Sequence, residues 1–203
     1  MNFAAKSLRC YPLTPKRWDN FATLFGPKGA CAGCWCMIWR LTRSEFDRGK
    51  GDGNKNAMHD LVASGVSPGL LGYVNKEPVA WCAIAPRDDY PALERSRILQ
   101  PVDATPVWSI SCLFIRKDCR KMGLSVGMLR AAIDFVRDRG GQVVEGYPVE
   151  PKKDEMPAVF AWTGLASAFL KAGFHECARR SETRPIMRFA IGANLRKRRR
   201  SKK

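Results

Sequence analysis

The strongest hydrophobic pattern of the chain lies in its second half. Residues 107–115 are almost continuously apolar or small, which is typical of a central strand covered on both faces. From Gly127 to Arg139 the apolar residues recur at helical spacing along one face, and Gly140-Gly141 then provides a stop. A further apolar run occupies 143–149. This alternation predicts a parallel β-α-β unit inside a mixed sheet.

Weaker patterns predict shorter elements around this unit. Thr14 precedes Pro15, which is the arrangement of an N-cap and a first helical position. The polar, glycine-rich stretch 49–56 is expected to connect two helices. The other expected elements are a strand at 8–12, a helix at 15–25, two helices within 41–64, a β-hairpin from 70–74 and 79–84, a helix at 164–172, and final strands within 174–189.

The composition is that of an ordinary folded protein. With 45% hydrophobic and 27% charged residues over 203 positions, the chain has enough apolar material for one domain with a core and is short for two. Its apolar runs fall short of the roughly 20 residues that a membrane-spanning helix needs. Residues 1–6 lack the long apolar region of a secretory signal. We therefore expect a cytoplasmic protein with no membrane segment.

The net charge of +16 is unevenly distributed. Seven of the positive charges fall in residues 196–203, and like charges in such a block repel one another and usually stay disordered. We expect one domain at 1–192, in which 31–56 is a loop region, and a disordered basic tail at 193–203. The tail has two interpretations. Either it attracts phosphates of nucleic acid or of a phosphorylated ligand, or it is a solvated segment that aids solubility.

Eight cysteines raise the question of metal or redox chemistry. Cys82 and Cys112 lie within apolar runs, where cysteine behaves as a small hydrophobe, and without an export signal the thiols are expected to be mostly reduced. Cys31-x-x-Cys34-x-Cys36 offers three thiolates at a spacing that suits a metal, but a fourth ligand is not obvious. A metal site, a redox pair, and pocket lining or packing are the alternatives for this segment, and we expect no metal.

The segment most informative about function is the turn between the expected central strand and the helix after it. It is short and basic from Arg116 to Lys121, with Gly123 near the helix start. Free N–H groups at a helix N-terminus form an anion site together with the helix dipole. Glycine allows the backbone to approach a phosphate closely, and the Ser125 hydroxyl adds a donor. The alternative is an ordinary strand-to-helix turn that contains a glycine.

This turn resembles the acetyl-CoA motif of the GNAT superfamily of N-acetyltransferases, Arg/Gln-x-x-Gly-x-Gly/Ala, with Arg120, Gly123 and Ser125 at the marked positions. Residues 169–174 (Phe-Leu-Lys-Ala-Gly-Phe) are similar to the aromatic-x-x-x-Gly-Phe signature of the same family. The resemblance covers roughly 69–189. It implies an α/β (α+β) GNAT fold, whose central mixed, mostly antiparallel sheet has about six to seven strands flanked by about four helices.

The resemblance also implies an activity. Family members transfer an acetyl group from acetyl-CoA, their co-substrate, to a primary amine by direct attack in a ternary complex. The acceptor is expected to be a small-molecule or polypeptide amine, and a homodimer is a further expectation. Backbone N–H groups from Met122 to Val126 would hold the pyrophosphate. The strand end would pair with pantetheine, and one N–H there would polarise the thioester carbonyl. The residues expected at the cofactor are Leu113, Phe114, Ile115, Arg120, Lys121, Met122, Gly123, Leu124, Ser125, Val126 and Phe169.

The expected catalytic residues depart from the family pattern. Phe169 stands where many family members have a tyrosine that protonates the departing thiolate, and phenylalanine has no proton to donate. Ser167 and Tyr147 are the nearest substitutes by sequence position. Glu145 lies in an apolar run, where burial raises a carboxyl pKa toward that of a working base. It is either a base or amine anchor, or a structural partner of an arginine such as Arg95, Arg97 or Arg184.

The resemblance implies that the loop region 31–56 lies on the acceptor side, with the acceptor near residues 31–40. In the GNAT fold the stretch between the first two helices usually lines the acceptor site, which implies that Trp35, Met37, Trp39 and Arg40 shape it. Arg40 would bind a carboxylate or phosphate of the acceptor. The alternative function is a non-catalytic GNAT scaffold that binds nucleic acid or ribosomes through its basic surface and tail.

Overall fold

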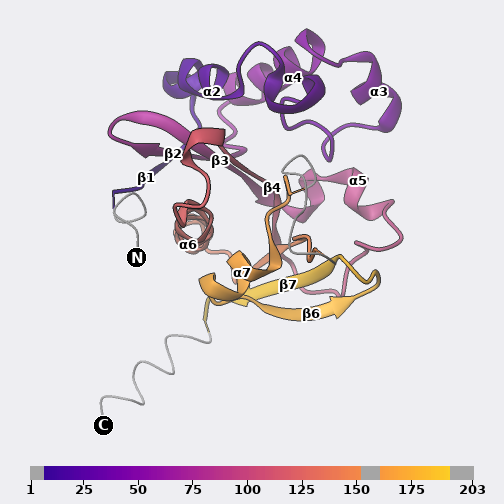
Figure 1. The fold of residues 1–203 in the computed structure, drawn as a ribbon. Helices are drawn as coiled ribbons and strands as arrows, with labels where there is room; N and C mark the ends of the chain where they lie inside the picture. The colour runs from indigo at the N-terminus through magenta and orange to yellow at the C-terminus, as the bar shows by residue number, and fades with distance from the viewer. Residues whose placement is uncertain (1–6, 152–160, 193–203) are drawn as a thin grey trace.

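A mixed β-sheet runs through the centre of the molecule (Figure 1). The computed structural model describes residues 7–151 and 161–192, and within them the sheet has seven strands in the order β1-β2-β3-β4-β5-β7-β6. Neighbouring strands are antiparallel, except that β4 and β5 are parallel. The strands are β1 (Arg9–Pro12), β2 (Gly69–Val74), β3 (Glu77–Pro86), β4 (Trp108–Ile115), β5 (Val143–Gly146), β6 (His175–Arg179) and β7 (Pro185–Ala190).

Helices cover both faces of the sheet (Figure 1). One face carries α2 (Trp18–Phe25), α3 (Arg43–Arg48) and α4 (Asp52–Ala63), and the other carries α6 (Leu124–Arg137) and α7 (Ala166–Ala172). The shorter helical segments are η1 (Pro15–Arg17), η2 (Gly29–Gly33), η3 (Arg87–Asp89), α5 (Pro91–Glu94) and η4 (Lys117–Cys119). None of the helices in the described part of the chain is both long enough and apolar enough to cross a membrane.

The two halves of the core meet at β4. Ile110 and Leu113 belong to the apolar cluster that includes α6 and α7, whereas Cys112 and Phe114 pack against the cluster under α2 and α4. Because both faces of the strand are covered, its apolar positions need not alternate with polar ones. The expected central strand and the parallel β4-α6-β5 unit are confirmed.

The helix after β4 begins earlier than its apolar spacing predicts. The structure starts α6 at Leu124 rather than at Gly127, because Gly123 adopts a left-handed φ of 77° and Leu124 is buried. Gly127 therefore lies inside the helix. A Cβ atom there would stand 2.7 Å from a methyl carbon of Leu8, so this glycine permits close packing of the N-terminal segment.

The polar stretch 49–56 is not wholly a connection, and its prediction as one is wrong from residue 52 onward. α4 begins at Asp52 after Gly51, whose φ is 87°. Asn54 is fully buried, and its side-chain amide donates to the carbonyl oxygens of Gly33 at 3.1 Å and Phe46 at 3.3 Å. The polar residue at this position thus ties three segments together.

Candidate active site

The parallel strands β4 and β5 pair over only a short distance. Their register pairs are Trp108↔Val144, Ser109↔Glu145 and Ile110↔Gly146. β5 then ends, because Pro148 has no N–H for a ladder, and Val149 pairs with Leu165 instead. The edge of β4 beyond Ile110 is therefore left without a β5 partner.

The segment around Trp162 lies against part of this edge. The backbone N–H of Leu113 donates a hydrogen bond of 2.7 Å to the carbonyl oxygen of Trp162. Gly164 also approaches closely, since a Cβ atom there would stand 3.1 Å from Cδ2 of Leu113. One backbone donor on the open edge is thus already engaged within the protein.

A β-bulge lies in the same part of β4. On the neighbouring strand Ala83 is opposite Cys112 and Ile84 is opposite Ile110, so Ser111 is the extra residue. Ser111 is only 1% exposed. Bulges often stand next to functional sites, where they redirect a side chain.

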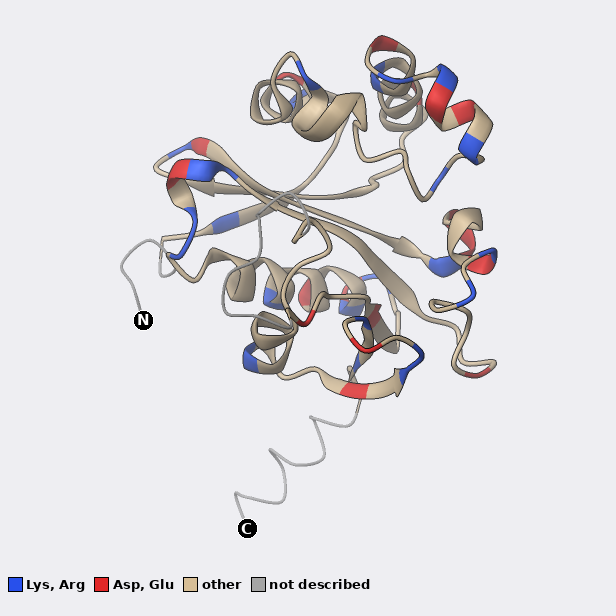
Figure 2. Cartoon of the chain, turned by 45° about the vertical axis from the view of Figure 1, so that its right-hand side comes forward, with Lys and Arg blue, Asp and Glu red and all other residues tan. Residues whose placement is uncertain are grey.

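The turn between β4 and α6 is stabilised by arginine side chains that contact other residues of the chain. Arg116 pairs with Glu77 at 3.1 Å and with Asp118 at 2.8 Å, which fixes the turn to the β2–β3 hairpin. The Nε atom of Arg120 donates to the carbonyl oxygen of Ile115 at 3.1 Å. Figure 2 shows basic residues along this turn and at the adjoining hairpin turn, with acidic residues among them.

The start of α6 presents free backbone donors. Lys121 and Gly123 have left-handed φ values of 62° and 77°, and no side chain caps the helix. The first four N–H groups of an α-helix have no partner inside the helix, and the helix dipole adds positive potential at this end. With 14 residues behind it, this end suits a phosphate group.

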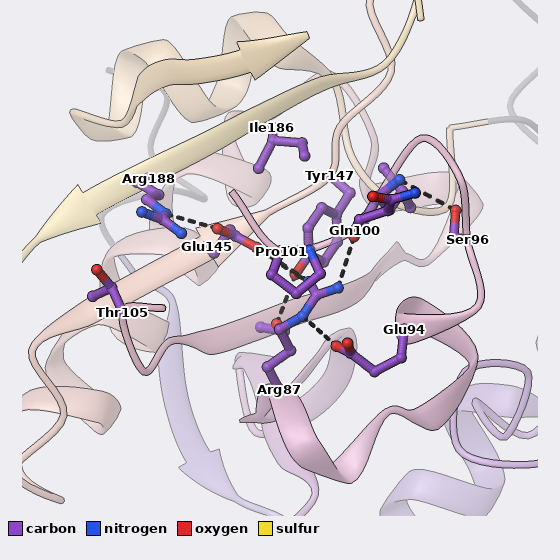
Figure 3. A network of polar contacts seen from close by, with 12 residues as sticks. Arg87, Glu94, Ser96, Gln100, Pro101, Thr105, Glu145, Tyr147, Ile186 and Arg188 are labelled. Carbon is purple, nitrogen blue, oxygen red and sulfur yellow. Dashed lines mark hydrogen bonds and ion pairs between the residues drawn. The ribbon is translucent and has the colours of Figure 1, made fainter. Parts of the chain in front are cut away.

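A buried ionic network lies at β5 (Figure 3). Glu145 has no solvent exposure. Its Oε2 atom accepts a bond of 2.7 Å from Arg188, and its Oε1 atom accepts from the Tyr147 hydroxyl at 2.7 Å and from Arg87 at 3.3 Å. The Tyr147 oxygen also accepts from Arg87 at 2.7 Å and lies 2.8 Å from Oγ of Ser109. We call Arg87, Ser109, Glu145, Tyr147 and Arg188 the Glu145 network.

The outer members of this network reach the surface. Arg188 pairs with Asp103 at 2.7 Å, and Arg87 pairs with Glu94 at 2.7 Å. The hydrogen bond from Arg188 holds the pKa of Asp103 well below its usual range. Burial, and then the neighbouring carboxylate of Glu145, raise the pKa of Tyr147. The tyrosine therefore stays protonated at neutral pH.

A second polar group adjoins α5. Arg40 pairs through Nη1 with Asp89 at 3.3 Å, and its Cζ atom lies 4.7 Å from the centre of the Tyr90 ring. The indole rings of Trp39 and Trp162 stack with their centres 5.9 Å apart. The same chain segment therefore contacts both Trp39 and the open edge of β4.

The cysteines of the 31–36 segment differ in their surroundings. Cys31 is exposed, and Cys36 is buried with its sulfur accepting a bond of 3.1 Å from the indole of Trp81. A hydrogen bond from Cys112 lowers the pKa of Cys36 despite burial, and the same contact, together with burial, raises that of Cys112. Within residues 7–151 and 161–192, no group of three or more His, Cys, Asp or Glu side chains is placed to hold a metal ion.

Comparison with protein families decides the family of the chain. A family model described as the acetyltransferase (GNAT) family matches residues 35–156, which is more than half of the sequence. The chain belongs to the GNAT acetyltransferase family. No curated protein matches the sequence.

Solved structures agree with the GNAT assignment. A GNAT acetyltransferase from Listeria monocytogenes is 9% identical with a TM-score of 0.55, covering 90% of this chain and 94% of its own. One from Streptococcus pneumoniae is 15% identical with a TM-score of 0.53, covering 91% and 99%. The PaiA N-acetyltransferase from Thermoplasma acidophilum, solved in complex with coenzyme A, is 10% identical with a TM-score of 0.51, covering 91% and 99%. At these identities the likeness shows the fold alone, and it confirms the expected GNAT fold.

Most of the residues predicted at the cofactor lie in one stretch of the GNAT fold. Leu113 to Ile115 end β4, and Arg120 to Val126 form the turn and the first residues of α6. The side chain of Leu124 packs in the core, so only its backbone N–H would contact a ligand. Phe169 lies apart on α7 and is fully buried. Its ring fills the space beside Gly146, where a Cβ atom would stand 2.3 Å from it.

The predicted catalytic residues do not share one open space. Glu145 and Tyr147 bind each other inside the Glu145 network, whereas Ser167 is exposed on the first turn of α7. The contacts of Glu145 favour its structural alternative. Its partners are Arg87 and Arg188, however, and not the arginines named from the sequence, which were Arg95, Arg97 and Arg184.

The predicted acceptor residues divide into two pairs. Trp35 and Met37 are 3% and 4% exposed and pack in the core beneath α2, which favours the packing alternative for this part of the segment. Trp39 and Arg40 lie further along, where Tyr90 and Ser111 join them. Neither Tyr90 nor Ser111 was identified from the sequence, because their proximity arises only when α5 folds against the β4 bulge.

Proposed function

We propose that this GNAT protein transfers an acetyl group from acetyl-CoA to a primary amine by direct attack in a ternary complex. The observation that carries the proposal is the left-handed turn through Lys121 and Gly123, which opens α6 beside the unpaired edge of β4. An anion site and a strand edge with free pairing capacity are the two features that a nucleotide with an extended amide arm requires.

The described residues fit such a ligand. The N–H groups at the start of α6 have no side-chain cap and suit a pyrophosphate, and the basic turn supplies positive charge beside them. The edge of β4 would pair with the amide arm through the backbone of Leu113 and Ile115. The N–H of Leu113 becomes available for the thioester carbonyl only when it exchanges its bond to the carbonyl oxygen of Trp162.

The chemistry requires little from titratable side chains. The lone pair of the neutral amine attacks the thioester carbonyl carbon, so that a C–N bond forms and the C–S bond breaks. The sulfur leaves with the bonding electrons, and the amine nitrogen gives up a proton to water. We assign polarisation of the carbonyl to the N–H of Leu113 after its release from Trp162. Since Glu145 and Tyr147 are engaged with each other, we assign no protein base, and the rate should follow the ionisation of the amine itself.

The test compares two glycines at opposite ends of α6. Gly123 precedes the helix and Gly140 follows it, with φ values of 77° and 76°, and a Cβ at Gly140 would meet nothing within 4 Å. Gly123→Val and Gly140→Val therefore impose similar backbone strain, but only the first blocks the anion site. Acetyl-CoA at 100 times its Kd should stabilise wild type and Gly140→Val by about 2.7 kcal/mol, as measured by thermal unfolding, and should leave Gly123→Val unchanged.

Two results would contradict the proposal. Equal stabilisation of both variants would mean that the nucleotide binds elsewhere. If acetyl-CoA does not stabilise the folded wild type, it is not the co-substrate, and the nucleic-acid alternative is favoured. Deleting the tail at 193–203 would then test that alternative. That tail lies outside the described residues.

A further inference from the structure

Four buried polar atoms near the bulge of β4 have no hydrogen-bond partner. Among the residues that the structure describes, they are Nε1 of Trp39, Nη2 of Arg40, the hydroxyl oxygen of Tyr90 and Oγ of Ser111. Buried polar atoms in native proteins are almost always bonded, so each exception needs an explanation. We call these four residues the unpaired donor cluster.

The four residues are neighbours. The guanidinium carbon of Arg40 lies 4.7 Å from the centre of the Tyr90 ring. The Ser111 hydroxyl is close enough to influence the pKa of Tyr90, which burial raises, yet the two hydroxyls lack the geometry of a hydrogen bond. Trp39 adjoins Arg40 in sequence and stacks on Trp162, whose carbonyl oxygen lies at Leu113 on the same strand as Ser111.

The hydrogen-bonding groups of the cluster indicate which atoms a ligand must provide. An indole N–H and a guanidinium N–H donate and never accept, and both hydroxyls are able to donate as well. A group with several acceptor oxygens is therefore the complementary ligand. An ionised carboxylate has about four acceptor positions on two oxygens, enough to accept one bond from each of the four unpaired atoms.

The local charge favours a carboxylate over a phosphate. Arg40 is the cation of the cluster, its side chain is 9% exposed, and Asp89 already pairs with its Nη1 atom. Its Nη2 atom has no hydrogen-bond partner and remains for a ligand. A single negative charge is matched by this arrangement better than the charge of about −2 that a phosphate carries.

We propose that the unpaired donor cluster is the acceptor subsite and that it binds the carboxylate of an amino-acid acceptor, with the charge-assisted bond coming from Arg40. This inference rests on the proposed acetyl transfer. It places the carboxylate at Ser111 and the amine near Leu113, two residues further along β4. One strand thus presents both the substrate anchor and the carbonyl-polarising N–H.

The test measures CoA release with matched pairs of amines. Each pair is an amino acid and the amino alcohol with the same side chain, whose amines have similar basicity. Wild type should prefer the acid by about tenfold or more in kcat/KM, the size of one hydrogen bond to a charged group. Arg40→Gln and Tyr90→Phe should each lose much of this preference while binding acetyl-CoA as wild type does. Arg43→Gln, an exposed arginine nearby in the chain, should keep it.

The outcomes separate the two proposals. Transfer at equal rates to acid and alcohol would overturn the subsite and leave the acetyl transfer standing. Preference for an aminophosphonate over the amino acid would overturn the choice of a carboxylate. If acetyl-CoA binds but a panel of amino acids neither reacts nor raises the melting temperature, the subsite is also wrong. If acetyl-CoA does not bind at all, the proposed acetyl transfer is contradicted, and with it the subsite that depends on it.

Discussion

The Glu145 network and the unpaired donor cluster are two polar groups of similar composition around β4. They differ in whether their polar atoms have hydrogen-bond partners. The Glu145 network contains a serine of β4, a tyrosine and an arginine, and so does the unpaired donor cluster. Tyr90 and Tyr147 even belong to one apolar cluster. Yet the Tyr147 hydroxyl has three partners within 2.8 Å, whereas the Tyr90 hydroxyl has none.

This difference separates structural polar groups from groups that await a ligand. A buried network with every member satisfied rigidifies the core, and it leaves no atom free to contact a substrate. A buried group with unmade bonds costs stability in the absence of a partner, and such strain is concentrated at functional sites. Burial alone does not distinguish the two groups, because Tyr90 and Tyr147 are both fully buried.

The largest expected effect comes from breaking the Glu145 network at its centre. Glu145→Gln removes the charge that holds Arg87 and Arg188, and loss of one partner from a buried ion pair costs about 3–5 kcal/mol. We expect the free energy of unfolding in urea to fall by this amount. Glu176→Gln is the matched control. It removes a carboxylate from an exposed pair with Arg179 and should cost less than about 1 kcal/mol.

A different result would change the role of Glu145. If Glu145→Gln unfolds like wild type but has lost its transfer activity at every pH, Glu145 is a base or an amine anchor, as its apolar surroundings in the sequence also suggested. Loss of stability with residual activity in the folded fraction would support the structural role.

The second test makes the same change in both tyrosines. Tyr147→Phe removes a hydroxyl with three partners and should lower the free energy of unfolding by about 1–3 kcal/mol. Tyr90→Phe removes a buried hydroxyl without a partner and should raise it by about 1 kcal/mol. We therefore expect the two Tyr→Phe substitutions to change the free energy of unfolding in opposite directions, as measured in urea without ligand. A destabilised Tyr90→Phe would show that its hydroxyl is satisfied in solution and would weaken the unpaired donor cluster.

The fold and the turn that we propose for phosphate binding were predictable because their signals are local. The apolar run of β4, the helical spacing of α6 and the glycine between them all lie within about thirty consecutive residues. They correspond to a strand, a helix and a backbone conformation that few residues besides glycine adopt. The structure confirms these elements, and it moves the helix start to Leu124 because a left-handed turn, not apolar spacing, determines where α6 begins.

The polar contacts were not predictable, because they join residues far apart in sequence. Glu145 could be identified as an unusual carboxylate, but its partners Arg87 and Arg188 are 58 and 43 residues away. Nothing in the local sequence distinguishes them from Arg95, Arg97 or Arg184. In the same way, Arg40 could be proposed as an anion ligand from its type alone, while Ser111 joined it only through the register shift between β3 and β4.

The smallest expected effect comes from the two serines of β4, and it tests the comparison most directly. Ser109→Ala removes a bond of 2.8 Å to Tyr147 and should cost about 1 kcal/mol, whereas Ser111→Ala should leave the free energy of unfolding unchanged or slightly higher. Combining each change with that of the adjacent tyrosine then measures the pairwise coupling. Ser109 and Tyr147 should couple by about 0.5 kcal/mol or more, and Ser111 and Tyr90 by close to zero. If Ser111 and Tyr90 couple as strongly, the two hydroxyls bind each other, and fewer donors remain for a carboxylate.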